Sequence, residues 1–354
     1  MISNISIMKS WQFVEKEKFV CIEEKLPPLK REEVLVEIAG CGICSSDCNV
    51  FFGRELGIKR SRALGHEISG KVIDGDKRLI GKEVIIPPVM PCHSCEICFS
   101  GRENRCLNAK IPGYNMGRLG GNSSHIIVPS RDLCILNKKR RLSLAHYSVV
   151  SDAVASAYYS LKRATIKKGD KVVIIGATGN AGVYATQFAK LFGAKEVVAI
   201  ARDEERLRNI KFYGATKTIS TINRTAKEVR QELLSYCLEK QLDPYCNWKI
   251  IEWSGSCEGQ KIAIEMLSFA SRLVIAGCGK YMNTIDFSKL MIFEAEIVGS
   301  WACPPRYLPE ILNLIDQEID IENFTYLLPM SEIDKAYRLT DKGIGKRIVL
   351  VPDF

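Results

Sequence analysis

The pattern of hydrophobic positions between residues 171 and 202 predicts one βαβ unit. Residues 172–175 form a short run rich in β-branched side chains, which is typical of a buried parallel strand. A glycine-rich turn follows, and the next apolar residues recur at helical spacing: Ala181, Ala185, Phe188 and Phe192. Residues 197–201 form a second apolar run. Strand, turn, helix and strand within about thirty residues is the arrangement that binds dinucleotides in parallel α/β folds.

The turn carries glycine at positions 176, 179 and 182, where a Cβ atom would keep the backbone away from a phosphate. This spacing differs from G-x-G-x-x-G, so the prediction of a cofactor site depends equally on the flanking strands and helix. A βαβ unit without a ligand is the alternative. We predict that the cofactor contacts the residues of this turn: Gly176, Thr178, Gly179, Asn180, Ala181 and Gly182.

The hydrophobic pattern outside this unit distinguishes two kinds of region within the chain. The first hundred residues alternate over short segments such as 34–39 and read as β-rich, whereas strands and helices alternate through the central third, which favours a doubly wound parallel sheet. After about residue 297, helical patterns at 308–315 and 333–339 precede a final strand at 347–351. The predicted fold class is α/β, with a β-rich N-terminal part and a doubly wound parallel sheet in the central part of the chain.

Composition fits a globular protein of two domains. The chain has 354 residues, of which 46% are hydrophobic and 26% charged. Its net charge of +9 is scattered, and the one compact basic run, 138–141, reads as a solvated loop, so we expect no nucleic-acid partner. Without a membrane-length apolar run or a signal-peptide core, we expect a cytoplasmic protein with no membrane partner. Fourteen cysteines then indicate thiols and metal ligands before disulfides.

The strongest local signal is a C-x2-C-x2-C-x7-C cluster of Cys92, Cys95, Cys98 and Cys106. Four closely spaced thiolates supply the tetrahedral set that structural zinc requires. A disulfide pair and an iron–sulfur cluster are the less favoured alternatives, and His93 inside the loop reads as a surface residue.

Cys44 and His66 suggest a second, dispersed metal site, although spacing alone equally allows a buried, hydrogen-bonded histidine.

The order of these motifs resembles the zinc-dependent medium-chain alcohol dehydrogenase family over nearly the whole chain. The matching stretches are Cys44-Ser-Ser-Asp47, Gly65-His-Glu67 with Gly70, the four-cysteine lobe and the βαβ unit. The resemblance implies a zinc-containing, GroES-like catalytic domain of residues 1–150 and 297–354 and an inserted Rossmann nucleotide-binding domain of residues 151–296. It also implies two zinc ions per chain and a nicotinamide cofactor. It implies that Cys44, His66 and Asp152 hold the catalytic zinc, and that Cys41 and Cys48 are packing thiols.

The resemblance also suggests roles around this zinc. Ser46 would pass on the substrate proton, Asp47 would orient His66, and Glu67 would lie behind the metal as an acid or an exchangeable ligand. Ala276, Gly277 and Cys278 would meet the carboxamide of the cofactor, and Lys346 or Arg347 its pyrophosphate. One departure is Asn49, which stands where a relay histidine is common, so the proton must take another path or go directly to solvent.

The end of the second strand predicts NADP(H) in preference to NAD(H). Ala201 stands where NAD-dependent members carry an aspartate that binds the ribose. Arg202 follows and could bind the 2′-phosphate, with Arg206 as a second contact. The alternative is that Arg202 is solvated and Asp203 binds the ribose.

The favoured function is a zinc-dependent dehydrogenase that transfers hydride between an alcohol, polyol or sugar and NADP(H). A zinc-independent quinone or enone reductase, a zinc-binding nucleic-acid module and a structural protein without catalytic chemistry are the alternatives. We expect a small-molecule alcohol or carbonyl substrate and a homo-oligomer, a dimer or tetramer. Phe51, Tyr114 and Trp301 are candidate pocket residues.

Overall fold

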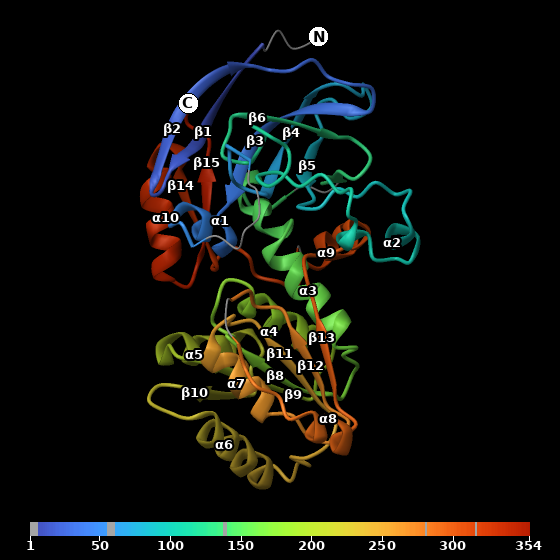
Figure 1. Cartoon of the computed structure of the whole chain (residues 1–354), viewed down its shortest axis with the longest axis vertical. Helices are drawn as coiled ribbons and strands as arrows, with labels where there is room; N and C mark the ends of the chain where they lie inside the picture. Colours follow the sequence, from blue (N-terminus) through green and yellow to red (C-terminus); the bar gives the residue numbers. More distant parts are fainter. Residues whose placement is uncertain (1–5, 55–60, 137–139, 280–281, 316) are drawn as a thin grey trace. The chain divides into compact units, whose positions relative to one another are not determined.

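The computed structural model describes residues 6–54, 61–136, 140–279, 282–315 and 317–354, so residues 138 and 139 of the basic run lie outside it. The chain forms two compact units (Figure 1). The first unit comprises Met1–Ala155 and Ala302–Phe354, and the second comprises Ser156–Trp301. The second unit therefore begins at 156 and ends at 301, where the sequence analysis placed these limits at 151 and 296.

The first unit is built around a seven-stranded sheet of order β14-β15-β3-β4-β5-β7, with β6 paired to β3, and a separate hairpin of β1 and β2. Its strands are β1 (Ile7–Glu15), β2 (Lys18–Lys25), β3 (Glu33–Gly42), β4 (Glu67–Asp74), β5 (Glu83–Ile86), β6 (His125–Pro129), β7 (Cys134–Ile135), β14 (Thr325–Pro329) and β15 (Arg347–Val351). Its helices are α1 (Ser45–Phe51), α2 (Glu96–Phe99), α9 (Leu308–Ile315) and α10 (Ile333–Lys342), and α3 (Ala153–Arg163) begins in it. Short 3-10 turns are η1 (Glu103–Arg105), η2 (Leu144–Val150), η4 (Pro305–Tyr307) and η5 (Met330–Glu332).

Strand β3 is the centre of this sheet, because it pairs with β4, β6 and β15. Seven of its ten residues are buried, which fits a strand with neighbours on both edges and packing on both faces. Helix α1 follows β3 directly, and the buried carbonyl of Tyr337 in α10 accepts a contact from the Cys48 thiol of α1. The sheet and α10 therefore hold the segment that carries Cys44, Ser46 and Asp47.

The second unit is a six-stranded sheet of order β10-β9-β8-β11-β12-β13 in which every pairing is parallel. Its strands are β8 (Lys171–Ile175), β9 (Glu196–Ala201), β10 (Lys217–Ser220), β11 (Trp248–Glu252), β12 (Arg272–Ile275) and β13 (Glu296–Gly299). Its helices are the remainder of α3, then α4 (Gly182–Leu191), α5 (Glu204–Ile210), α6 (Ala226–Glu239), α7 (Cys257–Glu265) and α8 (Phe287–Phe293), with the turn η3 (Lys211–Tyr213).

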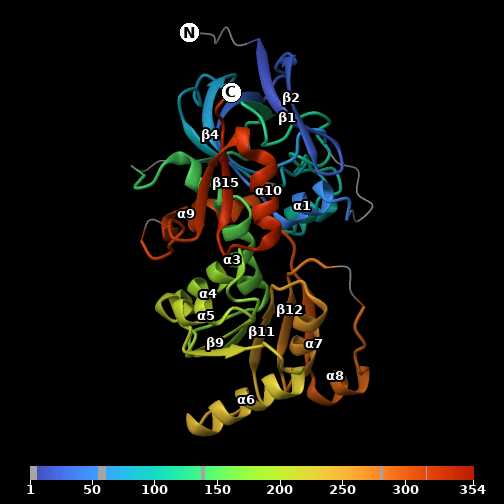
Figure 2. The same ribbon diagram turned by 90° about the vertical axis from the view of Figure 1, so that its left-hand side faces the viewer.

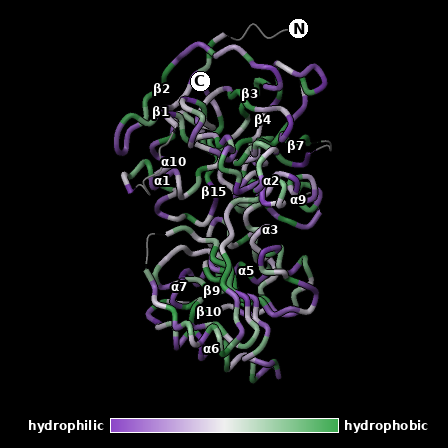
Figure 3. Tube along the Cα trace, turned by 45° about the vertical axis from the view of Figure 1, so that its right-hand side comes forward, coloured by the Kyte–Doolittle hydropathy of each residue, from purple (hydrophilic) through white to green (hydrophobic). Residues whose placement is uncertain are grey.

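Figure 2 shows α4 and α5 toward one side of this second sheet and α7 and α8 toward the other, with α6 beyond them. Figure 3 shows the hydrophobic segments gathered along the strands near β9, as expected for a sheet with covered faces. The strand order reverses beside β8, because β9 and β10 lie to one side of it and β11 to β13 to the other. In such sheets the crevice at the carboxyl ends of the strands at the reversal is where ligands bind.

The α/β fold class and the doubly wound sheet are confirmed. Helix α9 has the predicted bounds 308–315, and β15 the predicted bounds 347–351. Strand β13 explains why the second unit extends past residue 296: it pairs in parallel with β12, so residues 296–299 belong to this sheet. Its pattern of two exposed and two half-buried residues gives no sign of a buried parallel strand.

Candidate active site and metal centres

The four cysteines of the lobe converge in the structure. Cys95 caps the short helix α2, and Cys106 follows η1, so two local turns bring the four sulfur atoms together. Four sulfur–sulfur distances are 3.4 Å for Cys92–Cys106, 3.5 Å for Cys95–Cys98, and 3.9 Å for both Cys92–Cys98 and Cys95–Cys106.

A regular tetrahedron of sulfur atoms around zinc, with bonds of about 2.3 Å, has edges of about 3.8 Å. The lobe therefore fits zinc, and all four cysteines are free of disulfides. Hydrogen bonds from Ser94, and others from Cys106 and Cys95, lower the pKa of Cys92 to about 5, so this sulfur favours the thiolate that a metal needs. His93 lies outside the cluster and forms a 2.6 Å contact with Asp132 through Nε2.

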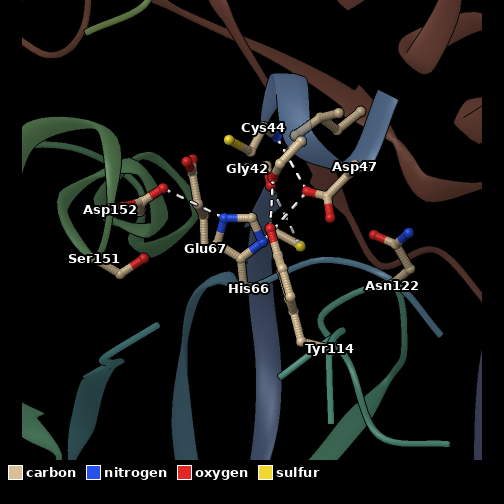
Figure 4. A network of polar contacts seen from close by, with 12 residues as sticks. Gly42, Cys44, Asp47, His66, Glu67, Tyr114, Asn122, Ser151 and Asp152 are labelled. Carbon is tan, nitrogen blue, oxygen red and sulfur yellow. Dashed lines mark hydrogen bonds and ion pairs between the residues drawn. The ribbon is translucent and has the colours of Figure 1, made fainter. Parts of the chain in front are cut away.

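A second constellation forms within the first unit from three separate segments. Cys44 caps α1, His66 and Glu67 stand at the start of β4, and Asp152 follows η2 just before α3. One ligand atom from each of these four residues lies within 4.8 Å of the other three. Figure 4 shows their side chains pointing toward one another.

Two carboxylates hold the His66 ring from opposite sides. Nε2 of His66 lies 3.3 Å from Oδ2 of Asp152, and Nδ1 lies 3.4 Å from Oδ2 of Asp47 (Figure 4). Asp47 is fully buried, and the same oxygen also accepts the backbone N–H of Cys44 at 3.2 Å. Burial opposes a positive charge on His66, but Asp47, Tyr114 and Asp152 outweigh it and raise the pKa of His66 well above its ordinary value. The site therefore favours a positive charge, which a divalent ion among the same acids would supply.

Glu67 is buried behind this constellation and has Arg347 as its charge partner. Nη2 of Arg347 lies 2.9 Å from Oε1 of Glu67, and Nη1 donates to the carbonyl of Ile43 at 2.9 Å. Neither carboxylate oxygen has a hydrogen-bond donor of good geometry among the described residues. A Cβ atom on Gly42 would lie 2.2 Å from Oε2 of Glu67, so glycine is required where β3 passes this carboxylate.

This arrangement decides between the two candidates for the pyrophosphate contact. Arg347 is only 4% exposed and its guanidinium already binds Glu67 and Ile43, so the interpretation of Arg347 as a phosphate ligand is wrong. Lys346 is exposed and stays a prediction. The role of Arg347 could not be predicted from the sequence, because its partners lie some 280 or more positions earlier in the chain and no local pattern links them.

The hydroxyl of Ser46 accepts a hydrogen bond of 2.8 Å from Tyr114. The Tyr114 ring also stands edge-on to His66, with 5.3 Å between ring centroids. Tyr114 therefore touches both the proposed proton carrier and the proposed metal ligand.

Phe51, by contrast, is fully buried and stacks on Phe19 with 5.1 Å between centroids, so its interpretation as a pocket residue is wrong. It occupies the inward face of α1, which the aromatic character alone does not reveal.

The packing thiols are where the sequence analysis placed them. Cys41 and Cys48 are buried, and burial raises the pKa of each well above its ordinary value. For Cys44 burial also acts to raise the pKa, but a hydrogen bond with His66 and the charge of Arg347 outweigh it, so the pKa falls. Of these three thiols, Cys44 is the one poised as a thiolate.

The glycine turn of the second unit has the close approaches that a phosphate cradle needs. Gly176 has a φ of +77°, and a Cβ atom on Gly182 would lie 2.1 Å from the carbonyl oxygen of Gly176. Helix α4 begins at Gly182 with Ala181 as its N-cap, and Thr178, Gly179 and Asn180 form the preceding turn. The glycine turn therefore leads directly into the N-terminus of α4, where the first backbone N–H groups of the helix can bind a phosphate. Gly277 and Cys278 follow β12 at the same carboxyl edge of the sheet.

At the end of β9, Ala201 is buried and Arg202 is exposed. Asp203 caps α5: its Oδ1 accepts the backbone N–H of Arg206 at 3.0 Å, and its Oδ2 lies 3.0 Å from Nε of Arg206. Both Asp203 oxygens thus have partners within the helix. The same ion pair occupies part of the Arg206 guanidinium.

Comparison with known proteins decides the family. Residues 30–138 match the alcohol dehydrogenase GroES-like domain, and residues 181–317 match the zinc-binding dehydrogenase domain. The chain belongs to the zinc-type medium-chain alcohol dehydrogenase family. It is an NAD(P)-dependent oxidoreductase of the alcohol dehydrogenase type.

Similar dehydrogenases span nearly the whole chain. A sorbitol dehydrogenase of Bombyx mori is 26% identical over 333 residues, covering 92% of this chain and 93% of its own. An NAD-dependent alcohol dehydrogenase of Sulfurisphaera tokodaii is 27% identical over 360 residues and covers 98% and 100%. The crystal structure of galactitol-1-phosphate dehydrogenase from Escherichia coli has the same fold, with a TM-score of 0.83, 24% identity and coverage of 97% and 100%.

The donor set of this dehydrogenase suits zinc. One thiolate, one neutral imidazole and one carboxylate neutralise a divalent ion, while Glu67 is already balanced by Arg347. Glu67 belongs to the same group of four candidate ligands, and neither of its oxygens makes a hydrogen bond within the described residues. Within the described ranges, no helix has the length and apolar composition to cross a membrane.

Proposed function

We propose that this dehydrogenase oxidises a small alcohol of the polyol or sugar-alcohol class, and reduces the corresponding carbonyl, with catalytic zinc held by Cys44, His66 and Asp152. The observation that carries the proposal is the convergence of these ligand atoms within 4.8 Å, with the Ser46 segment beside them. The relatives named for sorbitol and galactitol 1-phosphate support the polyol class. A zinc-independent quinone or enone reductase would leave this ligand set without a role.

A bound zinc ion supplies Lewis-acid chemistry, which lowers the pKa of a water or alcohol oxygen from about 15.7 toward 7. The protein contributes the arrangement around it. Asp47 holds Nδ1 of His66, which directs Nε2 into the constellation. Tyr114 donates to Oγ of Ser46 and so helps to fix this hydroxyl beside the constellation, where it would exchange a proton with a substrate oxygen. Asn49 carries no ionisable proton, so the proton leaves Ser46 by a path other than a histidine relay.

A second zinc ion in the four-cysteine lobe would have a structural role. Closed sites of four thiolates leave no coordination position for a substrate. Cys98 and Cys106 belong to a small hydrophobic cluster with Val89 and Ala109, so the metal would take the place of a larger core in this lobe.

The cofactor preference that we propose is NADP(H) over NAD(H). Ala201 removes the carboxylate that would repel a 2′-phosphate, a repulsion of several kcal/mol at an effective dielectric of about 20. Arg202 is exposed at this strand end, and Asp203, the alternative ribose ligand, already uses both oxygens in capping α5 and pairing with Arg206. The similar protein of Sulfurisphaera tokodaii is named NAD-dependent, so family membership alone does not decide the preference.

We also propose a homo-oligomer and a cytoplasmic location. Strand β13 ends the order of the second sheet, and the neighbouring helix α8 exposes Phe287, Met291 and Ile292 to solvent. A second copy would cover this apolar surface and pair with the strand edge. All fourteen cysteines are free, which suits a reducing compartment.

The test is a spectrophotometric panel of polyols, sugars, simple alcohols and their carbonyl counterparts with NADP(H) and NAD(H). We expect turnover with at least one polyol or sugar in the wild type and a loss of at least a hundredfold in Cys44→Ser. Equal turnover of an enone by wild type and Cys44→Ser, with no alcohol oxidised by either, would favour the zinc-independent reductase instead.

A further inference from the structure

Glu252 is a fully buried carboxylate that the proposed chemistry does not use. It is the last residue of β11, and its backbone pairs with Ile175 of β8 on one side and Ile275 of β12 on the other. The strand order reverses between β8 and β11, so this side chain lies at the reversal point, at the carboxyl ends of the strands. A buried acid at this position calls for an explanation, because burial without a cation is costly.

Among the described residues, the hydrogen bonds to the carboxylate of Glu252 all come from the loop that follows β11. Oε1 of Glu252 accepts the backbone N–H of Ser254 at 2.7 Å, the Ser254 hydroxyl, and the backbone N–H of Gly255 at 3.1 Å. Oε2 lies 3.3 Å from the same Gly255 nitrogen. The part of the chain that the structure describes offers it no lysine, arginine or histidine as an ion-pair partner. Burial raises the pKa of Glu252, and these donors oppose the rise.

The loop held in this way touches the other two loops at the same edge without intervening side chains. A Cβ atom on Gly176, in the glycine turn after β8, would lie 2.7 Å from the Ser254 nitrogen. A Cβ atom on Gly277, after β12, would lie 2.3 Å from the Gly255 nitrogen. A shift of the Ser254–Gly255 segment by even 1 Å would therefore move against both neighbouring turns, because backbone atoms cannot yield as side chains do.

We propose that Glu252 is a positioning residue of the dinucleotide site: its carboxylate fixes the loop after β11 so that three glycine-containing loops form one cradle for the cofactor. It acts through the loop and has no contact of its own with the ligand. The inference rests on the proposed use of a nicotinamide cofactor.

This role depends on the acceptor oxygen of Glu252 and does not require its negative charge. Glu252→Gln keeps one carbonyl oxygen for the Ser254 and Gly255 donors, whereas Glu252→Leu keeps the volume and removes every acceptor. Glu196 offers a matched control, because it is a hydrogen-bonded acid at the opposite, amino-terminal end of β9, a strand of the same sheet that β8 separates from β11. Its Oε2 accepts from Tyr236 at 2.6 Å and from Thr216 at 2.7 Å.

The experiment measures dissociation constants of NADP⁺, NADPH and NAD⁺ by fluorescence or calorimetry, together with zinc content and melting temperature, for the intact chain. We expect Glu252→Leu to weaken binding of the better cofactor at least tenfold with zinc content unchanged. Glu252→Gln should stay within about threefold of wild type, and Glu196→Leu should lower the melting temperature without weakening cofactor binding more than threefold.

Folded Glu252→Leu that binds the cofactor as wild type does would overturn the inference while leaving the proposed function intact. Should Glu252→Leu fail to fold, Ser254→Ala decides, because it removes a loop hydroxyl from Oε1 and must weaken binding at least threefold. Equal losses in Glu252→Leu and Glu196→Leu would mean that Glu252 has a general structural role only. A wild type that binds none of the three cofactors would overturn the proposed function itself.

Discussion

The ion pair of Arg347 and Glu67 makes a prediction whose size follows from its burial. Arg347→Met removes a guanidinium that is 2.9 Å from the Glu67 carboxylate and donates to the Ile43 carbonyl, in a place where Glu67 is fully buried. Breaking a buried pair by removing one partner costs about 3–5 kcal/mol. A unit of roughly 200 residues loses about 2–4 °C in melting temperature per kcal/mol, so we expect a fall of roughly 6–20 °C.

The assay is differential scanning calorimetry of the zinc-loaded protein. Lys346→Met is the neighbouring control, because Lys346 is exposed and its loss should change the melting temperature by no more than about 2 °C. Glu67→Gln/Arg347→Met should recover part of the loss, since it no longer buries an uncompensated charge. A single variant Arg347→Met that melts within 2 °C of wild type, or a double variant that melts lower than the single one, would refute the reasoning.

Three further predictions concern the site and the cofactor. Asp152→Ala should lower catalytic zinc occupancy and activity, whereas Asp152→Cys should retain much of the metal; full zinc and normal turnover in Asp152→Ala would make Glu67 the better ligand candidate. Tyr114→Phe should lower kcat roughly threefold to tenfold with zinc content unchanged, because it removes one hydrogen bond to Ser46, and an unchanged kcat would count against that contact. The double variant Ala201→Asp/Arg202→Ala should shift the ratio of kcat/KM from NADP(H) toward NAD(H); a wild type that prefers NAD(H), or an unchanged ratio, would contradict the assignment.

Local features were the ones that the sequence could predict. The four-cysteine lobe needs only short turns to assemble, so its spacing alone predicted the cluster that the structure shows. The βαβ unit is similarly continuous in sequence, and its strands and helix lie where the hydrophobic pattern placed them. Both depend on contacts within about thirty residues, which periodicity and spacing can capture.

The dispersed site could not be reached from spacing. Cys44, His66 and Asp152 come from three segments that only the sheet of the first unit brings together, so their grouping came from a family resemblance. Arg347 and Glu252 show the same limit in another way: each is a charged residue at a strand end, and nothing in the neighbouring residues says that the side chain is buried. Sequence patterns report which residues are apolar far better than which polar residues are enclosed.

The central claim is that Cys44, His66 and Asp152 hold a catalytic zinc that is separate from the zinc of the cysteine lobe. Elemental analysis of wild type, Cys44→Ser and Cys95→Ser tests it most directly. We expect two zinc ions per chain in wild type and about one in each variant, with Cys44→Ser folded but nearly inactive and Cys95→Ser destabilised. Wild type with no more than one zinc per chain, or Cys44→Ser with both ions retained, would contradict it.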